Sequence, residues 1–377
     1  MVAEFHCIFV EWTLRTKKIF QILEDILKSL LTLLGAAASV MAQPNTAKKD
    51  TMPTNNPSVS SYSKSARTEI GNAWDVQFFA AFNEYYLSQD GMELAVHSNS
   101  NNPFYPSTVE STGALVSLDT KYHPGFSAGF TLNTPFDQWV LTGDYLWARS
   151  HTSGSSSATS PDFLFAITTN VSFQDFLSSL QANWKVGMDL FNLDLSYPFY
   201  LGKKWMITPT FGIMSGWIRQ YFHTSALQIT TTDPAVQLSL KSNSWMIGPT
   251  AGFENCWLLG QGFSLFGNMS ASVLYTRYTT LNFKNRNTAT SADWKIVASL
   301  DGWNAVHPYL DAGMGVKWGS FFHCNKYYVE FSAAYNFMTF FAQNQMMPLV
   351  QNTNTISSYA PGNLYMHGVS IEGSFLF

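Results

Sequence analysis

Charged side chains are scarce in this sequence. Lys, Arg, Asp and Glu make up 12% of its 377 residues, whereas aromatic residues reach 16%. A soluble core with so few charges would be poorly soluble, and a bundle of membrane helices would be far more hydropathic than this chain, whose mean hydropathy is −0.03. The composition favours a transmembrane β-barrel, in which one face of each strand meets lipid and the other meets water.

Long apolar runs are missing near the N-terminus as well. The stretch "SLLTLLGAAASVMA" is too short for a membrane-spanning helix, which needs ~20 apolar residues. Because basic residues precede it and small residues end it, it predicts a secretory signal peptide over residues 1–42. We expect residues 43–72, rich in Ser, Thr, Asn and Pro, to form a flexible segment. Residues 73–377 would then form the outer-membrane β-barrel.

Cysteines and catalytic motifs give little support to an enzyme. Cys7 lies in the expected leader, and Cys256 and Cys324 are too few for a disulfide framework and lack the spacing of metal ligands. His151 and His223 are expected near strand ends, but neither lies in a nucleophile elbow, and no HExxH occurs. We therefore expect no catalytic residues, no metal and no cofactor. The net charge of −4 and the lack of a basic stripe argue against nucleic acid as a partner.

Apolar and polar residues alternate from Trp74 onward, and a period of two indicates β-strands. Most of these segments exceed the roughly 5–6 residues of a typical globular strand, as a strand crossing a membrane would. The expected strands lie near residues 74–87, 124–133, 139–150, 184–200, 204–224, 244–259, 263–281, 307–321, 327–342 and 364–377.

Short and long connections alternate between these strands. This pattern predicts an all-β, antiparallel up-and-down transmembrane barrel of about 10 strands, with long outer loops and short periplasmic turns. Twelve strands is the alternative, because "MELAVHS" and "ALVSLDT" in the first long loop could supply another pair. Apolar residues at helical spacing in "FQDFLSSLQANW", residues 173–184, predict a short helix in another long loop.

The phase of the strands assigns side chains to lipid or to the lumen. In strand 184–200 the phase is in conflict, because the series that places Phe191 outward also places Asp189 and Lys185 outward. Either a β-bulge near Asp189 and Leu190 resets the phase, or the residues before Asp189 lie above the membrane. The residues expected to line the lumen are Asp75, Asp144, Asp194, Glu254, Asp311, Lys317, Glu330 and Glu372.

Aromatic residues mark the expected membrane boundaries and the end of the chain. Trp205 and Trp217 bracket one strand, and Trp245 and Trp257 bracket the next, as expected for aromatics at the two membrane interfaces. The chain ends on Phe377, with Phe375 on the same face. We expect these two residues to serve as an assembly signal on the closing strand.

Several stretches together resemble a known family. The most specific is "NLDLSYPFYLGKKWMITPTFGIMSGWIRQ", and "GFSAGFTLNTPFDQWVLTGDYLWARSHT" and "VHPYLDAGMGVKWGSFFHCNKYYVEFSAAYNF" add to it. They are similar to the major-outer-membrane-protein-like barrels of chlamydia-like and Legionella-type intracellular bacteria, over roughly residues 125–377. The resemblance implies an abundant surface barrel with porin-like or structural duties, and it supplies no catalytic residues.

These observations lead to a first hypothesis and an alternative. The first is porin-like passive diffusion of small cationic or neutral solutes across the outer membrane. The alternative is a structural or adhesive surface barrel without a conducting pore, and a barrel enzyme is less favoured than either. The expected partners are outer-membrane lipids and lipopolysaccharide, the barrel-assembly machinery and a host-cell surface ligand of the long loops; an oligomer is left open.

Overall fold

The structure is a computed structural model. It describes residues 75–98, 113–134, 139–159, 162–166, 177–228, 236–287, 294–322, 327–346 and 361–376. The expected signal peptide and the flexible segment 43–72 lie outside these residues. Within them, no helix is long and apolar enough to cross a membrane.

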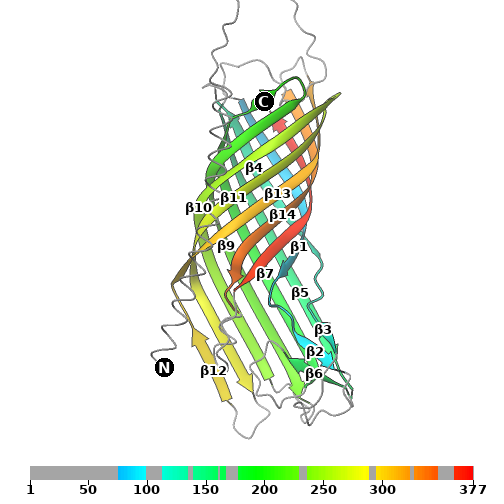
Figure 1. Cartoon of the computed structure of the whole chain (residues 1–377), viewed down its shortest axis with the longest axis vertical. Helices are drawn as coiled ribbons and strands as arrows, with labels where there is room; N and C mark the ends of the chain where they lie inside the picture. Colours follow the sequence, from blue (N-terminus) through cyan, green and yellow to red (C-terminus); the bar gives the residue numbers. More distant parts are fainter. Residues whose placement is uncertain are drawn as a thin grey trace, which may run out of the picture. The chain divides into compact units, whose positions relative to one another are not determined.

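Ten long strands form a closed ring, in which each strand pairs with the strands before and after it (Figure 1). All of these pairings are antiparallel. The ring strands are β1 (Asp75–Gln89), β4 (Tyr122–Asn133), β5 (Val140–Ser157), β7 (Leu177–Ser196), β9 (Trp205–Gln228), β10 (Val236–Gly260), β11 (Phe263–Asn287), β13 (Trp303–Phe322), β14 (Tyr327–Asn344) and β15 (Gly362–Leu376).

The last strand closes the ring on the first. Gln77 of β1 lies opposite Leu376 of β15, and the register continues without a break to Gln89 and Leu364. Closure leaves no open sheet edge in the membrane, where unpaired backbone groups would be costly. The ten-strand up-and-down barrel expected from the sequence is confirmed.

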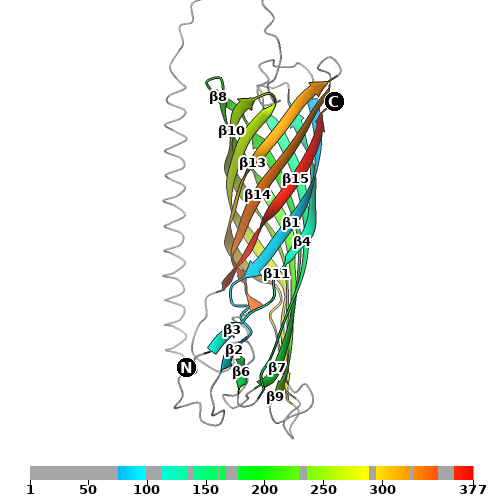
Figure 2. The same cartoon turned by 90° about the vertical axis from the view of Figure 1, so that its right-hand side faces the viewer.

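The twelve-strand alternative is wrong. The segments that could have supplied two more strands form the short strands β2 (Ala95–Ser98) and β3 (Gly113–Val116). These pair with each other, and β2 also pairs with β6 (Phe163–Ala166), so they lie outside the ring at its long-loop end (Figure 2). Two further short strands, β8 (Phe199–Leu201) and β12 (Trp294–Ser299), pair with β9 and with β11.

The two ends of the ring differ in their connections. At one end the connections are short. In the β10–β11 turn, Gly260, Gln261 and Gly262 have φ of 110°, 53° and 83°, and this left-handed backbone favours glycine. At the other end β7, β9, β10 and β11 run beyond the neighbouring strands, so the strands are longer and the loops shorter than the sequence predicted.

The predicted helix within residues 173–184 is wrong from Leu177 onward, because these residues belong to β7. Residues 173–176 lie outside the described part. A register shift between Leu177 and Ser179 accounts for the error. One extra residue there separates the buried Leu177 and Leu180 by three positions, so a bulged strand has the apolar spacing of a helix.

The inner and outer faces of the strands exchange character along their length. On β7 the pairing runs unbroken past Asp189, so the expected bulge there is wrong. The strand instead leaves the apolar outer zone at that level, as the other interpretation held. From the short-turn end, the outer face reads Leu195, Leu193, Phe191, Asp189 and Lys185, and the inner face reads Ser196, Asp194, Asn192, Leu190, Met188, Val186 and Trp184.

Candidate functional site: the barrel interior and its outer rim

The half of the barrel near the short turns encloses a cavity of about 600 Å³. Its lining runs from residues at the short-turn rim, such as Asp75 and Pro198, to Tyr85 and Tyr309 in the middle of the barrel. The structure brings together all eight residues that the sequence assigned to the lumen: Asp75, Asp144, Asp194, Glu254, Asp311, Lys317, Glu330 and Glu372.

Several of these charged groups are held by neighbouring side chains. Lys317 Nζ donates to Glu254 Oε1 at 2.7 Å, and Asn192 Nδ2 donates to Asp144 Oδ2 at 3.0 Å. With seven carboxylates and one lysine among those eight residues, the cavity is acidic and suits water and small cations. Within the described chain, no group of three or more His, Cys, Asp or Glu could hold a metal ion.

Beyond the cavity the interior is filled with apolar side chains. We call the following set the apolar plug. Its members come from nine of the ten ring strands, belong to one buried cluster and are at most 6% exposed: Tyr85, Leu146, Leu190, Met214, Met246, Leu274, Tyr309, Phe340 and Met366. Because Tyr85, Leu190 and Tyr309 also line the cavity, the plug forms its outer end wall.

Four polar residues farther out in the interior are linked by hydrogen bonds. The Tyr278 hydroxyl lies 3.2 Å from His307 Nε2 and donates to the backbone carbonyl of Gln343 at 3.2 Å. Gln343 Nε2 donates to Ser244 Oγ at 3.0 Å. All four residues are buried. Paired groups of this kind hold an interior in one arrangement, because each would lose its partner if the packing loosened.

Aromatic residues line both limits of the apolar outer zone. Trp205 lies directly opposite Trp257 across β9 and β10, and Trp217 lies opposite Trp245. The two pairs are twelve residues apart on β9, which is about 40 Å along the strand and about 30 Å along the axis of a barrel with strands tilted ~40°. This matches the hydrocarbon core of a bilayer.

The opposite side of the ring carries aromatic residues as well. The ring of Tyr86 stacks on the ring of His367, and the ring of Tyr122 meets His367 edge-on. His367 Nδ1 lies 2.6 Å from the Tyr335 hydroxyl oxygen. Phe375, of the expected assembly signal, is 40% exposed on the outer face and contacts the ring of Tyr327. Phe377 lies outside the described residues.

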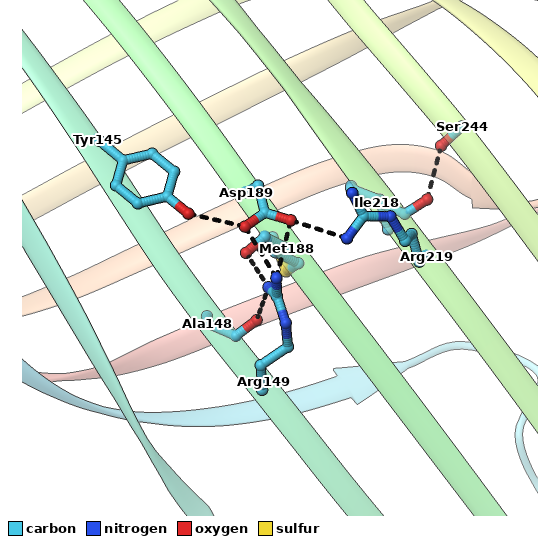
Figure 3. A network of polar contacts seen from close by, with 8 residues as sticks. All are labelled: Tyr145, Ala148, Arg149, Met188, Asp189, Ile218, Arg219 and Ser244. Atoms are coloured by element: carbon cyan, nitrogen blue, oxygen red, sulfur yellow. Dashed lines mark hydrogen bonds and ion pairs between the residues drawn. The ribbon is translucent and has the colours of Figure 1, made fainter.

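Just beyond Trp217 the outer face carries a network of ions (Figure 3). Arg149 Nη2 donates to both carboxylate oxygens of Asp189 at 2.8 and 2.9 Å, and Arg219 Nη1 donates to Asp189 Oδ2 at 3.1 Å. The Tyr145 hydroxyl donates to the same carboxylate at 2.8 Å. Arg149 also lies over the Trp147 ring, 5.0 Å from its centroid. Asp189 thus fixes two arginines at the edge of the apolar zone.

These arginines belong to a larger basic surface that the sequence analysis missed. We define the basic face as the Lys and Arg residues on the outer side of β5, β7, β9, β10, β11 and β12. On that face of the described strands, Asp189 is the only acidic residue. The members are Arg149, Lys185, Arg219, Lys241, Arg277, Lys284, Arg286 and Lys295.

The sequence showed no basic stripe, and the expectation that the protein has no basic surface was therefore wrong. The cations are far apart in the chain and come together only through the strand register. A local signal was present: an aromatic residue is followed two positions later by Arg at Trp147–Arg149, Trp217–Arg219 and Tyr275–Arg277. Residues two apart in a strand share a face, so this spacing places Arg beside an interfacial aromatic.

One sequence string resembles a nucleophile motif without its structural context. Residues 125–129 read "GFSAG", but they lie inside β4, whereas the GxSxG motif requires a sharp turn between strand and helix. Ser127 accepts a hydrogen bond from Asn83 Nδ2 at 3.2 Å. The two histidines considered from the sequence do not support a catalytic pair either: His151 is exposed on β5, and His223 Nδ1 lies 2.9 Å from Ser239 Oγ.

A closed antiparallel meander with an apolar outer band between two sets of aromatics is the architecture of bacterial outer-membrane β-barrel proteins. The short turns of such barrels face the periplasm, and the long loops face outward. The chain belongs to the family described as Legionella pneumophila major outer membrane protein precursor, whose model matches residues 67–377. It is a protein of the outer membrane, as the resemblance implied.

Three solved structures are among those to which the chain is similar. The outer membrane protease OmpT from Escherichia coli is 7% identical over 80% of this chain and 96% of its own, with a TM-score of 0.38. Ail of Yersinia pestis, solved with a heparin analogue, is 8% identical over 81% and 99%, with a TM-score of 0.23. A FadL homologue from Pseudomonas aeruginosa is 9% identical over 81% and 90%, with a TM-score of 0.24. No curated protein sequence matches the chain.

Proposed function

We propose that this protein is a structural and adhesive surface barrel whose interior is closed to diffusion. It anchors in the outer membrane through its apolar band and presents the long outer ends of β7, β9, β10 and β11 to the surroundings of the cell. A ligand on a host cell would meet this outward-facing part of the molecule first. The proposal corresponds to the alternative that the sequence left open.

The apolar plug is the observation that carries this proposal. Met214, Met246 and Leu274 are each 1% exposed, although they point into a barrel that would need water at this level to conduct ions. The interior of a small barrel, of about eight strands, can be filled by its own side chains, and here the large side chains of the plug fill the slightly wider ring. Apolar interiors packed in this way exclude water. The acidic cavity therefore ends at the plug.

Conductance of the purified full chain in planar bilayers tests the proposal. We expect the barrel to insert without producing regular current steps, and migration that changes on heating would show that the inserted material is folded. Truncating the plug with Tyr85→Ala, Met214→Ala and Tyr309→Ala should join the cavity to the outer side and create steps. Regular steps from the unaltered barrel would contradict a closed interior.

Passive diffusion of small cationic or neutral solutes is the second candidate, and the acidic cavity favours it. Carboxylates in a confined space attract cations more strongly than in bulk water. Under this alternative, the unaltered barrel would conduct with a preference for cations, measurable as a reversal potential across a salt gradient. Asp194→Asn, Asp311→Asn and Glu330→Gln should then weaken that preference. An unselective current would leave the carboxylates without a role.

We also propose that Phe375 and Phe377 form the signal by which the barrel-assembly machinery accepts the chain. The exposed position of Phe375 on the closing strand supports this role. Deleting Phe377, or replacing it with Lys, should sharply lower the amount of folded barrel in the membrane without affecting export. Normal amounts of protease-resistant barrel in that variant would exclude the proposed signal.

A further inference from the structure

The basic face contains a compact group of three cations around one aromatic residue. Lys185 of β7 and Lys241 of β10 both lie opposite Tyr221 of the intervening β9. Arg219 lies two residues along β9 on the same outer face. We name Lys185, Arg219 and Lys241 the cation triad.

Strand geometry places the triad within reach of one ligand. Adjacent strands lie about 4.8 Å apart and residues two apart in a strand about 6.7 Å, so the Cα atoms of Lys185 and Lys241 are about 10 Å apart. The Cα of Arg219 is about 8 Å from each of them. Lys and Arg side chains are long enough to converge over Tyr221 from these positions. Such a group matches an anion with several acceptor oxygens, because Arg binds phosphate through paired hydrogen bonds and Lys adds positive charge.

The triad also lies at a defined depth. Trp217 is next to Arg219 on the outer face, on the membrane side, and its neighbour Trp245 belongs to the same outer set of aromatics. Trp residues prefer the level of the lipid headgroups, so the triad begins where the headgroups of the outer leaflet lie. Lys185, Arg219 and Lys241 are all exposed. Asp189, held also by Arg149 and Tyr145, accepts a hydrogen bond from Arg219 and so limits its movement.

We propose that the cation triad binds the phosphate group of an outer-leaflet glycolipid headgroup, with Trp217 and Trp245 against the upper part of its acyl region. The site goes beyond the proposed function and does not depend on whether the interior conducts. It lies on one side of the barrel: the outward-facing charge on β1 is Glu84, and that strand carries no Lys or Arg in its described residues. Bound lipid would therefore be held along β7, β9 and β10.

The position of the cation triad at the aromatic boundary favours a lipid phosphate over a sulfated glycan as its ligand. A sulfated glycan arriving from outside would be expected to contact the distal cations, Lys284, Arg286 and Lys295, at the outer end of β11 and on β12. The triad instead adjoins the aromatic boundary, where a lipid phosphate is already concentrated in two dimensions. Each basic residue near an anionic lipid surface contributes about 1 kcal/mol, so two substitutions should be measurable.

The test is binding of bisphosphorylated lipid A to the full-length barrel in detergent, measured by native mass spectrometry. The variant K185Q/K241Q should weaken binding about tenfold or more. The matched control is K203Q/K204Q, which removes the same two charges from the short turn before β9 and should change binding by less than about twofold. Because all four lysines are exposed, both variants should fold, and heat-dependent migration checks this. If the double variant failed to fold, K241Q compared with K204Q would answer the same question.

Three competing probes separate the phosphate lipid from other ligands. Lipid A without its phosphates should bind at least about tenfold more weakly than the bisphosphorylated form to the unaltered barrel, and inorganic phosphate should displace the lipid only at far higher concentration. Equal binding of the dephosphorylated lipid, or equal losses in the two double variants, would refute the site. Displacement by inorganic phosphate at the lipid's own concentration would assign the triad to free phosphate. Tighter binding of a heparin oligosaccharide, with the same dependence on Lys185 and Lys241, would assign it to a sulfated glycan.

Discussion

In the half of the barrel near the short turns, the outer face is apolar and the inner face is polar; in the half near the long loops, both are reversed. On β7 the change falls between Phe191 and Asp189 on the outside and between Asn192 and Leu190 on the inside. The first half is built for lipid outside and water inside, and the second for water outside and a packed core inside. The same strand is therefore stabilised in two different ways: by lipid on its outer face in one half, and by a packed apolar interior in the other.

The reversal explains how strands of such different length belong to one ring. β10 has 25 residues and β1 has 15. The extra length of β10 is stabilised by burial of Leu238 and Leu240, which pack in one cluster with Leu94 and Leu164 from the segments outside the ring. Burying a side chain of this size contributes about 1.5–3 kcal/mol. The outer half therefore resembles the core of a soluble protein.

The largest expected effect on the free energy of unfolding comes from placing one positive charge in the apolar plug and, for comparison, in the polar interior near the short turns. Met246→Lys puts an ammonium group into the plug, where Met246 is 1% exposed and does not line the cavity. Thr250→Lys puts it on the same strand beside the acidic cavity. An uncompensated buried charge costs about 3–5 kcal/mol, so the first change should strongly lower the free energy of unfolding and the second should change it little. Urea unfolding of the barrel in lipid vesicles measures both, and similar losses would mean that the two interiors do not differ.

A somewhat smaller loss of free energy of unfolding is expected when a positive charge is placed on the outer face of the two halves. Leu193 is 48% exposed in the apolar band, and Asn183 lies on the outer face of the same strand in the far half. Leu193→Arg should lower the free energy of unfolding by about 2–4 kcal/mol if the residue faces the middle of the bilayer, and Asn183→Arg should have almost no effect. The ratio of folded to unfolded barrel in vesicles at increasing urea gives both values. A large loss at Asn183 would place the membrane boundary farther out.

The smallest effect concerns the ions at the level where the faces exchange. Asp189→Asn removes the carboxylate shared by Arg149 and Arg219 and should cost about 1 kcal/mol, because the side chains of the two arginines are 34% and 55% exposed and stay in contact with solvent. Tyr145→Phe removes one hydrogen bond to the same carboxylate and should cost less. High salt should reduce the effect of Asp189→Asn by screening the ion pairs. An effect that is independent of salt would mean that Asp189 acts through packing.

The sequence predicted the half of the barrel in the membrane better than the other half. A strict alternation of apolar and polar residues gave all ten strands there, and the same phase placed Asp194 and Asp311 on the inner face. The outer ends of the long strands were missed because the alternation reverses there. Near the short turns the apolar residues face outward, whereas in the outer half they face inward. A bulge near Leu177 and another between Tyr278 and Thr280 also interrupt the alternation in this outer half.

The plug and the basic face could not be predicted from the sequence for a different reason. Each strand contributes only one to three residues to either feature, and a single Leu190 or Lys241 is unremarkable in its own segment. Only the register between strands brings Leu190 to Leu146, or Lys185 and Lys241 to the two sides of Tyr221. The residue contacts that define both features are therefore properties of the closed ring.

The unequal length of the strands also has a mechanical consequence. A force that pulls outward on the end of β10 acts along the strand, parallel to its neighbours β9 and β11, while the hydrogen bonds between them run across it. Many of these bonds then share the load and must break together. The pairing of β2 with β3 involves four residue pairs, and a pull across it would separate them one after another. A pull on the long strands β9, β10 and β11 is thus transmitted to the membrane-embedded part of the barrel, because it loads many hydrogen bonds at once. A pull on β2 and β3 separates only these short strands.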